Sequence, residues 1–336
     1  MSEASVPLAP WLDRQLRSLL AQRGHAWLLQ GPSGLGQYEL AMALASAWLC
    51  EQPSEAGACG HCPSCHAIAV RTHADLAVLM PETQMLDLAW PLSEKAQGEI
   101  DDKKRKPSKD IRVEAMREVV EFAQRTDARG RGKVVLVYPA ERMNVITANA
   151  LLKTLEEPAG DVRFVLATEA AHQLPPTIRS RCQPHTMVWP QAEEALRWLA
   201  TQGVADDAGQ ALLRSAGGRP SNALRQSASG QNPAWWAALP KAMQQGNAQH
   251  LAELSPAQAI DALQKLCHDL LLKGSGAEPR FFMASQLPAC SASVMALTDW
   301  FKRLMQSART AEHPFNAGLM LEALANDAQQ VLLARG

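Results

Sequence analysis

Apolar residues in the first half of the chain follow two alternating patterns. Short continuous apolar runs, of the length of buried strands, occupy residues 25–30, 76–80, 133–138 and 162–168. Between them, apolar residues recur every three or four positions, as on one face of a helix, in residues 11–23, 40–50, 113–123 and 147–158. Strands that alternate with helices predict an α/β domain in which flanking helices pack against a parallel sheet.

The second half of the chain shows only the helical pattern. No strand-like run follows Pro190, and short helices are expected in residues 191–229. The remainder repeats the helical spacing, beginning with a capping box formed by Ser255 and Gln258. Because 336 residues exceed one ordinary hydrophobic core, several domains are expected. The patterns divide the chain into an α/β domain, a small helical domain and an all-helical domain, at 1–189, 190–230 and 231–336.

Residues 31–38, Gly-Pro-Ser-Gly-Leu-Gly-Gln-Tyr, link the first strand to the helix that follows it. Two glycines five positions apart, Gly31 and Gly36, in a strand–loop–helix frame are typical of a phosphate-binding P-loop, whose backbone N–H groups face an anion. The side chains that carry the chemistry are absent. Gln37 stands where a lysine contacts the terminal phosphates, and Tyr38 stands where a serine or threonine binds magnesium.

A third loss lies at the end of the strand at 133–138. In a P-loop ATPase this strand ends in acidic residues that hold magnesium and polarise water. Here the end reads Tyr138, Pro139 and Ala140, and Glu141 follows as an expected solvated loop residue. The lysine, the hydroxyl and the acids are thus missing together. This predicts a nucleotide-site scaffold that has lost its ATPase chemistry.

Four of the seven cysteines lie close together, at Cys50, Cys59, Cys62 and Cys65. With the spacing C-x8-C-x2-C-x2-C, turns can bring four thiolates into a tetrahedral zinc site, and clustered cysteines in a reducing compartment favour metal over disulfides. His61 and His66 are the alternative ligands, and reduced, free cysteines are the other interpretation. Because four thiolates leave no open position for water, we expect a structural zinc module at about residues 50–65.

Composition and charge narrow the possible functions. The formal net charge is −1, so any DNA contact would come from a local face or from an assembly. The mixed charges at 101–110 are expected to form a solvated insertion, with a DNA-contacting loop as the alternative. No apolar run reaches the roughly 18 residues that span a bilayer, and the first residues show no basic-then-apolar signal, so we expect a cytoplasmic protein without membrane contact.

These motifs together resemble a known family. Gly31 and Gly36, the four-cysteine insert, the stretch 148–158 and the Ser-Arg-Cys at 180–182 make the chain similar to the clamp-loader branch of the AAA+ ATPases. The Ser-Arg-Cys that follows this helix and strand is the most specific part of the resemblance, which extends over nearly the whole chain. The degenerate phosphate loop is similar to that of an ATPase-dead subunit, because the motor subunits of this branch keep the lysine, the hydroxyl and the acids.

The resemblance implies a function and partners. It implies a non-catalytic subunit of the clamp loader of DNA polymerase III, a DNA-directed DNA polymerase, which loads the sliding clamp onto primed DNA. The implied partners are gamma/tau-type motor subunits and a delta-type subunit in a hetero-pentameric ring, with the clamp and primer-template DNA contacted through the assembly. Arg181 would act in trans on a neighbouring subunit's ATP. The domains at 190–230 and 231–336 would be the helical lid, with a sensor-type arginine at Arg219, and the collar that joins subunits.

Two other functions fit parts of the sequence. An active motor ATPase would use the phosphate loop, but Gln37, Tyr38 and Pro139 oppose it, and no bound ATP is expected. A stand-alone zinc-containing nucleic-acid-binding protein would need a basic face near the cysteines, yet that segment carries Glu51 and Glu55.

Overall fold

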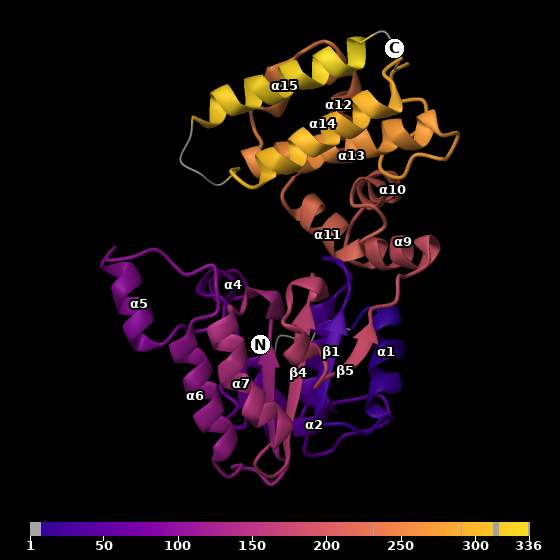
Figure 1. Ribbon diagram of the computed structural model, residues 1–336. Helices are drawn as coiled ribbons and strands as arrows, with labels where there is room; N and C mark the ends of the chain where they lie inside the picture. The colour runs from indigo at the N-terminus through magenta and orange to yellow at the C-terminus, as the bar shows by residue number, and fades with distance from the viewer. Residues whose placement is uncertain (1–7, 231, 290, 312–315, 335–336) are drawn as a thin grey trace. The chain divides into compact units, whose positions relative to one another are not determined.

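The computed structural model of the chain describes residues 8–230, 232–289, 291–311 and 316–334 (Figure 1). The chain divides into two compact units, Met1–Glu194 and Ala195–Gly336. Strands occur in the first unit, and the described residues of the second unit form helices and the segments that connect them. Within the described part of the chain, no helix is long and apolar enough to cross a membrane.

The first unit is built on a parallel sheet. Its described strands are β1 (Ala26–Gln30), β2 (Leu76–Leu79), β3 (Lys133–Val137), β4 (Val162–Thr168) and β5 (Gln183–Thr186). The order across the sheet is β2-β3-β4-β1-β5, and every neighbouring pair is parallel. The strand that leads into the phosphate loop, β1, therefore lies between β4 and β5.

Helices cover both faces of this sheet. These helices include α1 (Pro10–Leu20), α2 (Gln37–Leu49), α3 (Pro63–Ala69), α6 (Val113–Gln124) and α7 (Val145–Glu156). In β3, Val135 and Val137 share a buried cluster with residues of α6 and α7, whereas Val134 shares a different cluster with residues of α2 and α3. Successive residues of a strand point to opposite faces, which explains why all of β3 is buried. The predicted α/β fold with flanking helices is confirmed.

Further helical segments connect these elements. They are α4 (Glu82–Asp87), α5 (Glu94–Asp101), α8 (Pro176–Arg179), and the 3-10 turns η1 (Ala140–Arg142) and η2 (Ala171–Gln173). The sequence does not predict α5, which lies in a polar stretch and begins where the Ser93 side chain accepts a hydrogen bond from the Ala96 N–H. It also does not predict β5, because Gln-Pro-His-Thr has no apolar run. Pairing with β1 at the sheet edge makes this segment a strand, and an edge tolerates its proline.

The second unit contains two groups of packed helices. Apolar residues of α9 (Ala192–Thr201), α10 (Asp206–Ser215) and α11 (Pro220–Ala228) form a small core. A larger core, which contains Trp236, Phe282 and Trp300, is formed mainly by α12 (Pro233–Gln244), α13 (Pro256–Gly274), α14 (Val294–Ala308), α15 (Ala317–Leu333) and the turn η3 (Ala248–Leu251). The capping box predicted at Ser255 and Gln258 is confirmed at the start of α13.

Candidate functional site

The phosphate loop joins β1 to α2 and depends on glycine for its backbone conformation. Gly36, directly before α2, has a φ of +94°, in the left-handed region that glycine adopts without strain. A Cβ at Gly36 would lie 2.6 Å from Cδ1 of Leu12, a residue of α1. Trp11, on the same helix, directs its indole Nε1 to the carbonyl of Leu35 at 3.4 Å. Helix α1 therefore packs directly against the loop.

The side chain of Gln37 folds back onto the loop instead of facing an anion. Its amide nitrogen donates to the carbonyl oxygens of Gly31, at 2.7 Å, and Pro32, at 2.8 Å. Gln37 is only 2% exposed, so this side chain is part of the core. An amide NH2 has two N–H donors, and both have an acceptor here. The loop thus binds its own side chain at the position where a P-loop lysine would bind phosphate.

Aromatic residues occupy the region where the magnesium ligands are expected. The Tyr38 hydroxyl accepts a hydrogen bond from the Trp90 indole at 2.7 Å, and burial raises the pKa of Tyr38. The ring centroids of Tyr38 and Tyr138 are 5.5 Å apart. The Tyr138 hydroxyl donates to Glu169 at 3.1 Å. The Tyr38 hydroxyl is thus bonded to an indole, and its ring packs on that of Tyr138. The two tyrosines form an aromatic cluster in this region.

Glu141 differs from the solvated loop residue that the sequence predicts. It is half-buried, and its carboxylate accepts hydrogen bonds from the Thr168 hydroxyl, at 2.7 Å, and from the Glu169 N–H, at 3.1 Å. The expectation of a solvated loop residue was wrong because η1 turns this side chain back to the end of β4. An acidic residue does lie near the carboxyl ends of the central strands, but its carboxylate is used to hold β4.

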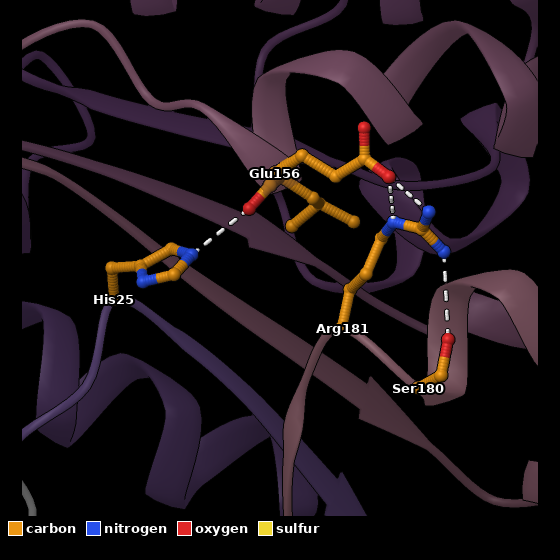
Figure 2. Close-up of a pocket in the computed structure, with 5 residues that line it drawn as sticks. His25, Glu156, Ser180 and Arg181 are labelled. Carbon is orange, nitrogen blue, oxygen red and sulfur yellow. Dashed lines mark hydrogen bonds and ion pairs between the residues drawn. The ribbon is translucent and has the colours of Figure 1, made fainter.

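Arg181 lies at the opposite end of the strands, two residues before β5. Figure 2 shows its side chain beside Glu156 and Ser180. Its Nε donates to Oε1 of Glu156 at 2.5 Å, and its Nη2 contacts the same carboxylate oxygen. Its Nη1 donates to the Thr177 carbonyl at 2.8 Å. The Arg181 side chain is 32% exposed and that of Glu156 is 45% exposed. The two form an ion pair at the rim of a surface depression that is also lined by His25 and Ser180.

Two other sites named from the sequence make local contacts. In the second unit, Arg219 is half-buried, and its Nε donates to the carbonyl of Ala216 at 2.7 Å. In the charged stretch at 101–110, Arg105 forms ion pairs with Glu82, at 2.5 Å, and with Glu99, at 2.7 Å. The Arg105 guanidinium therefore has a structural role, because it ties this stretch to α4 and α5.

The four cysteines predicted to bind zinc converge on one point. The sulfur atoms of Cys50, Cys59, Cys62 and Cys65 all lie within 4.8 Å of one another. The Cys50–Cys62, Cys59–Cys65 and Cys50–Cys65 sulfur pairs are separated by 3.8, 3.9 and 3.7 Å. A tetrahedral site with bonds of about 2.3 Å places its sulfur atoms about 3.8 Å apart. The spacing of the thiols therefore fits zinc, while His61 and His66 are exposed and stand outside this group.

The surroundings of the cluster also suit metal-bound thiolates. Backbone N–H groups of Gln52 and Cys59 donate to the Cys50 sulfur at 3.4 and 3.3 Å. Burial would raise the pKa of Cys62, but backbone N–H groups, chiefly that of Cys65, lower it to about 6. In the absence of a metal, burial raises the pKa of the Cys50 and Cys65 thiols. The insert is also tied to the sheet, because Glu51 accepts from Arg129 at 3.1 Å just before β3. These contacts give a compact module with a structural role.

Several residues of these sites have no clear signal in the sequence. Trp90, Glu169 and Glu156 are single polar or aromatic residues in otherwise ordinary segments. Glu156 lies 25 residues from Arg181, and Trp90 lies 52 residues from Tyr38. A signal exists only for Glu156, which belongs to the stretch 148–158 that carries part of the family resemblance. The partner that it contacts becomes evident only in the fold.

A parallel sheet with a glycine loop between its inner strand β1 and the next helix defines the class of P-loop domains, and here a cysteine insert follows that helix. A solved structure of a DNA polymerase III gamma subunit-related protein from Thermotoga maritima shares this fold, with a TM-score of 0.51 and 16% sequence identity. The superposition covers 96% of this chain and 99% of that one. The predicted fold class, an AAA+ P-loop domain followed by helical domains, is confirmed.

The sequence profile described as "DNA polymerase III, delta subunit" matches residues 12–189, which is more than half of the chain. The chain therefore belongs to this family. It is 41% identical over 208 residues to the DNA polymerase III subunit delta' of Pseudomonas aeruginosa, a match that covers 61% of this chain and 56% of that protein. The delta' subunit of Escherichia coli is 36% identical over 221 residues, covering 64% of this chain and 59% of that protein. The resemblance to the clamp-loader branch, and within it to delta-prime, is confirmed.

The similarity also reaches the tau subunits. The DNA polymerase III subunit tau of Escherichia coli is 35% identical over 158 residues, which cover 47% of this chain and 20% of that protein. All three matches span less than two thirds of the relatives' own length. They therefore identify the family, and the activity and partners of this chain are matters of proposal.

Proposed function

We propose that this chain is a clamp-loader subunit of DNA polymerase III that does not hydrolyse ATP itself and supplies Arg181 to the ATP of a neighbouring subunit. The relatives of this chain include delta', tau and gamma subunits of DNA polymerase III, which supports a role in the clamp loader. The observation that carries the proposal is the phosphate loop, where Gln37 donates to the carbonyls of Gly31 and Pro32.

The proposed loss of ATPase activity follows from the chemistry of phosphoryl transfer. That reaction needs a cation on the terminal phosphates and a magnesium ion held by a short hydroxyl and an acid. Here the three positions hold a neutral amide, a phenol bonded to Trp90 and a tyrosine that is followed by proline. Tyr38 and Tyr138 fill the space with aromatic surface, so restoring a single cation would leave the metal without ligands.

Arg181 is suited to act on a phosphate outside its own subunit. A guanidinium stays charged at any physiological pH and presents forked donors that match phosphate oxygens. The side chain is partly exposed and precedes an edge strand of the sheet, β5. In the proposed ring, this edge faces the ATP of a gamma/tau-type motor subunit. The active-motor alternative conflicts with the same loop contacts. The stand-alone nucleic-acid-binding alternative would need a basic face at the cysteine module, where Arg129 is paired with Glu51.

The remaining parts have supporting roles in this proposal. Cys50, Cys59, Cys62 and Cys65 would hold one structural zinc ion. Residues 190–230 would be the lid, and 231–336 the collar that joins the subunits in a hetero-pentameric ring with a delta-type subunit. The clamp and primer-template DNA would be contacted through the ring, in the cytoplasm of a bacterial cell.

The test is to compare the chain alone with the chain in its assembly. The isolated chain should neither hydrolyse ATP nor retain it during gel filtration. Mixed with motor subunits and a delta-type subunit of the same organism, it should co-elute and restore clamp- and DNA-stimulated hydrolysis. Hydrolysis by the highly purified chain, or full stimulation of the loader without it, would overturn the proposal.

A further inference from the structure

The ion pair between Arg181 and Glu156 suggests that the same site is regulated. Within its own subunit, Arg181 directs two nitrogens to one oxygen of Glu156 (Figure 2). Its third nitrogen donates to the Thr177 carbonyl. A guanidinium has five N–H donors, so most of this group is turned toward its own chain. An arginine in this position is poorly placed to bind a phosphate elsewhere.

Glu156 is placed to hold this arginine reversibly. It is the last residue of α7, and the negative end of a helix adds to the attraction for a cation. Both side chains are partly exposed, and pairs of this kind contribute little net energy. The pair is therefore strong enough to favour one position of Arg181 and weak enough to open when a triphosphate competes for the guanidinium.

We infer that Glu156 is an intramolecular competitor of the neighbour's ATP, a positioning residue that holds Arg181 in a withdrawn resting state. This inference rests on the proposed function of Arg181. Arg181 reaches a neighbouring triphosphate only when it leaves Glu156, so the chain contributes less to hydrolysis before the loader is fully assembled on clamp and DNA. Because a ligand shifts such an equilibrium only by its differential affinity, a triphosphate that is correctly presented moves Arg181 to the extended state.

The central experiment compares the variant that removes the charge of Glu156 with a variant that removes the charge of a neighbouring glutamate. Glu157 is also exposed, and no hydrogen bond or ion pair of its side chain is found among the described residues. In the reconstituted loader without clamp or DNA, Glu156→Gln should raise basal ATP hydrolysis about two- to fivefold, the range set by an exposed ion pair. Glu157→Gln should leave the basal rate unchanged, which separates the specific pair from a general loss of negative charge.

A double mutant tests whether the effect passes through Arg181. In an Arg181→Ala background, Glu156→Gln should leave the basal rate of ATP hydrolysis unchanged, since the effects of mutating two residues that act as a pair are not additive. A readout without partners is the NMR signal of the Arg181 Nε–H in the isolated chain. Its exchange with water should be faster in Glu156→Gln and unaltered in Glu157→Gln.

The outcomes separate this inference from the function on which it rests. If Arg181→Ala leaves loader activity intact, the proposed function fails. If Arg181→Ala lowers hydrolysis while Glu156→Gln matches Glu157→Gln in both rate and exchange, only the withdrawn state is overturned. A fall in basal rate with Glu156→Gln would also overturn it, because Glu156 would then help Arg181 to act.

Discussion

The two ends of strands β1 and β5 have opposite characters. At the carboxyl end of β1, the phosphate loop is closed by its own side chains, with Gln37 2% exposed and Leu35 fully buried. At the amino end of β5, Arg181 and Glu156 form an ion pair, and their side chains remain 32% and 45% exposed. The strands run parallel side by side, so one pair of neighbouring strands carries both regions.

The difference indicates what each end contributes. Side chains that are buried in hydrogen bonds stabilise the fold and are unavailable to a ligand, whereas a partly exposed charged pair adds little stability and stays available. Under the proposed function, the P-loop scaffold has lost its own nucleotide chemistry and keeps a charged edge that serves another subunit. The comparison leads to four predictions, from the largest expected effect to the smallest.

The first prediction concerns the zinc module, which follows α2. We expect the phosphate loop to keep its structure when the module loses its metal. Zinc binding by small cysteine modules contributes on the order of 10 kcal/mol, so Cys62→Ser should release the metal and unfold the insert locally. Chelator-free protein should contain about one zinc per chain, and hydrogen exchange in Cys62→Ser should rise at 50–69 and stay low at 31–38. A wild-type zinc content far below one would contradict the site, and loss of protection at 31–38 would show that the loop depends on the metal.

The second prediction concerns the open end. An arginine that acts in trans on ATP accelerates hydrolysis by about a thousandfold or more, so Arg181→Ala should abolish turnover at the one neighbouring site. The bulk rate of the loader should fall only partly, because other motor sites keep their own arginines, and clamp loading should fall further. Arg181→Lys should rescue poorly, since lysine lacks the forked donors.

A matched control for this prediction lies two residues away. Arg179, also exposed, is the last residue of α8, and no hydrogen bond or ion pair of its side chain is found among the described residues. Arg179→Ala should therefore assemble and hydrolyse ATP like the wild type. Complex formation is checked by size exclusion before each rate is measured. A normal rate with Arg181→Ala in an intact complex would reduce Arg181 to a surface residue.

The third prediction concerns the closed end. Gln37→Ala removes two partly buried hydrogen bonds and leaves two loop carbonyls without their donor, which should cost about 1–3 kcal/mol of the free energy of unfolding. Gln124→Ala, at an exposed position at the end of α6, should change it by less than about 0.5 kcal/mol. Urea denaturation measures both. Gln37→Lys should still hydrolyse no ATP, and turnover by that variant would show that the aromatic cluster does not block the metal.

The fourth and smallest effect involves His185 of β5, which links the edge strand to α1. Its Nε2 lies 3.0 Å from Oε1 of Gln15, and burial lowers the pKa of His185 below its usual value. In the unfolded chain this histidine takes up a proton near pH 6.5, whereas in the folded chain it does so only at a lower pH. The free energy of unfolding therefore keeps its full value above about pH 6.5 and declines as the pH falls below it. His185→Asn should flatten the decline in melting temperature between pH 7 and 5. An unchanged profile would assign the decline to other groups, such as His73, whose pKa burial also lowers.

Much of the fold was predictable because its signals are local. Continuous apolar runs identified β1, β3 and β4, glycine spacing identified the phosphate loop, and the cysteine spacing identified a cluster whose sulfurs do converge. Local signals failed where a segment takes its structure from a neighbour. The polar segment of β5 becomes a strand because β1 offers it an edge, and Glu141 is drawn inward because Thr168 and Glu169 present donors to it.

The sequence by itself determined which P-loop side chains are absent from the phosphate loop and which strand and helix the loop connects. Gln37, Tyr38 and Pro139 replace the P-loop lysine, hydroxyl and acid whatever the packing, because an amide, a phenol and a proline have fixed chemistry. Only the tertiary structure decided what these residues do instead. The Gln37 amide turns onto loop carbonyls, Tyr38 meets Trp90 across 52 residues, and Arg181 meets Glu156 across 25. Hydrogen bonds and ion pairs depend on distance and direction in space, and residues far apart in sequence acquire both only when the sheet and its helices are assembled.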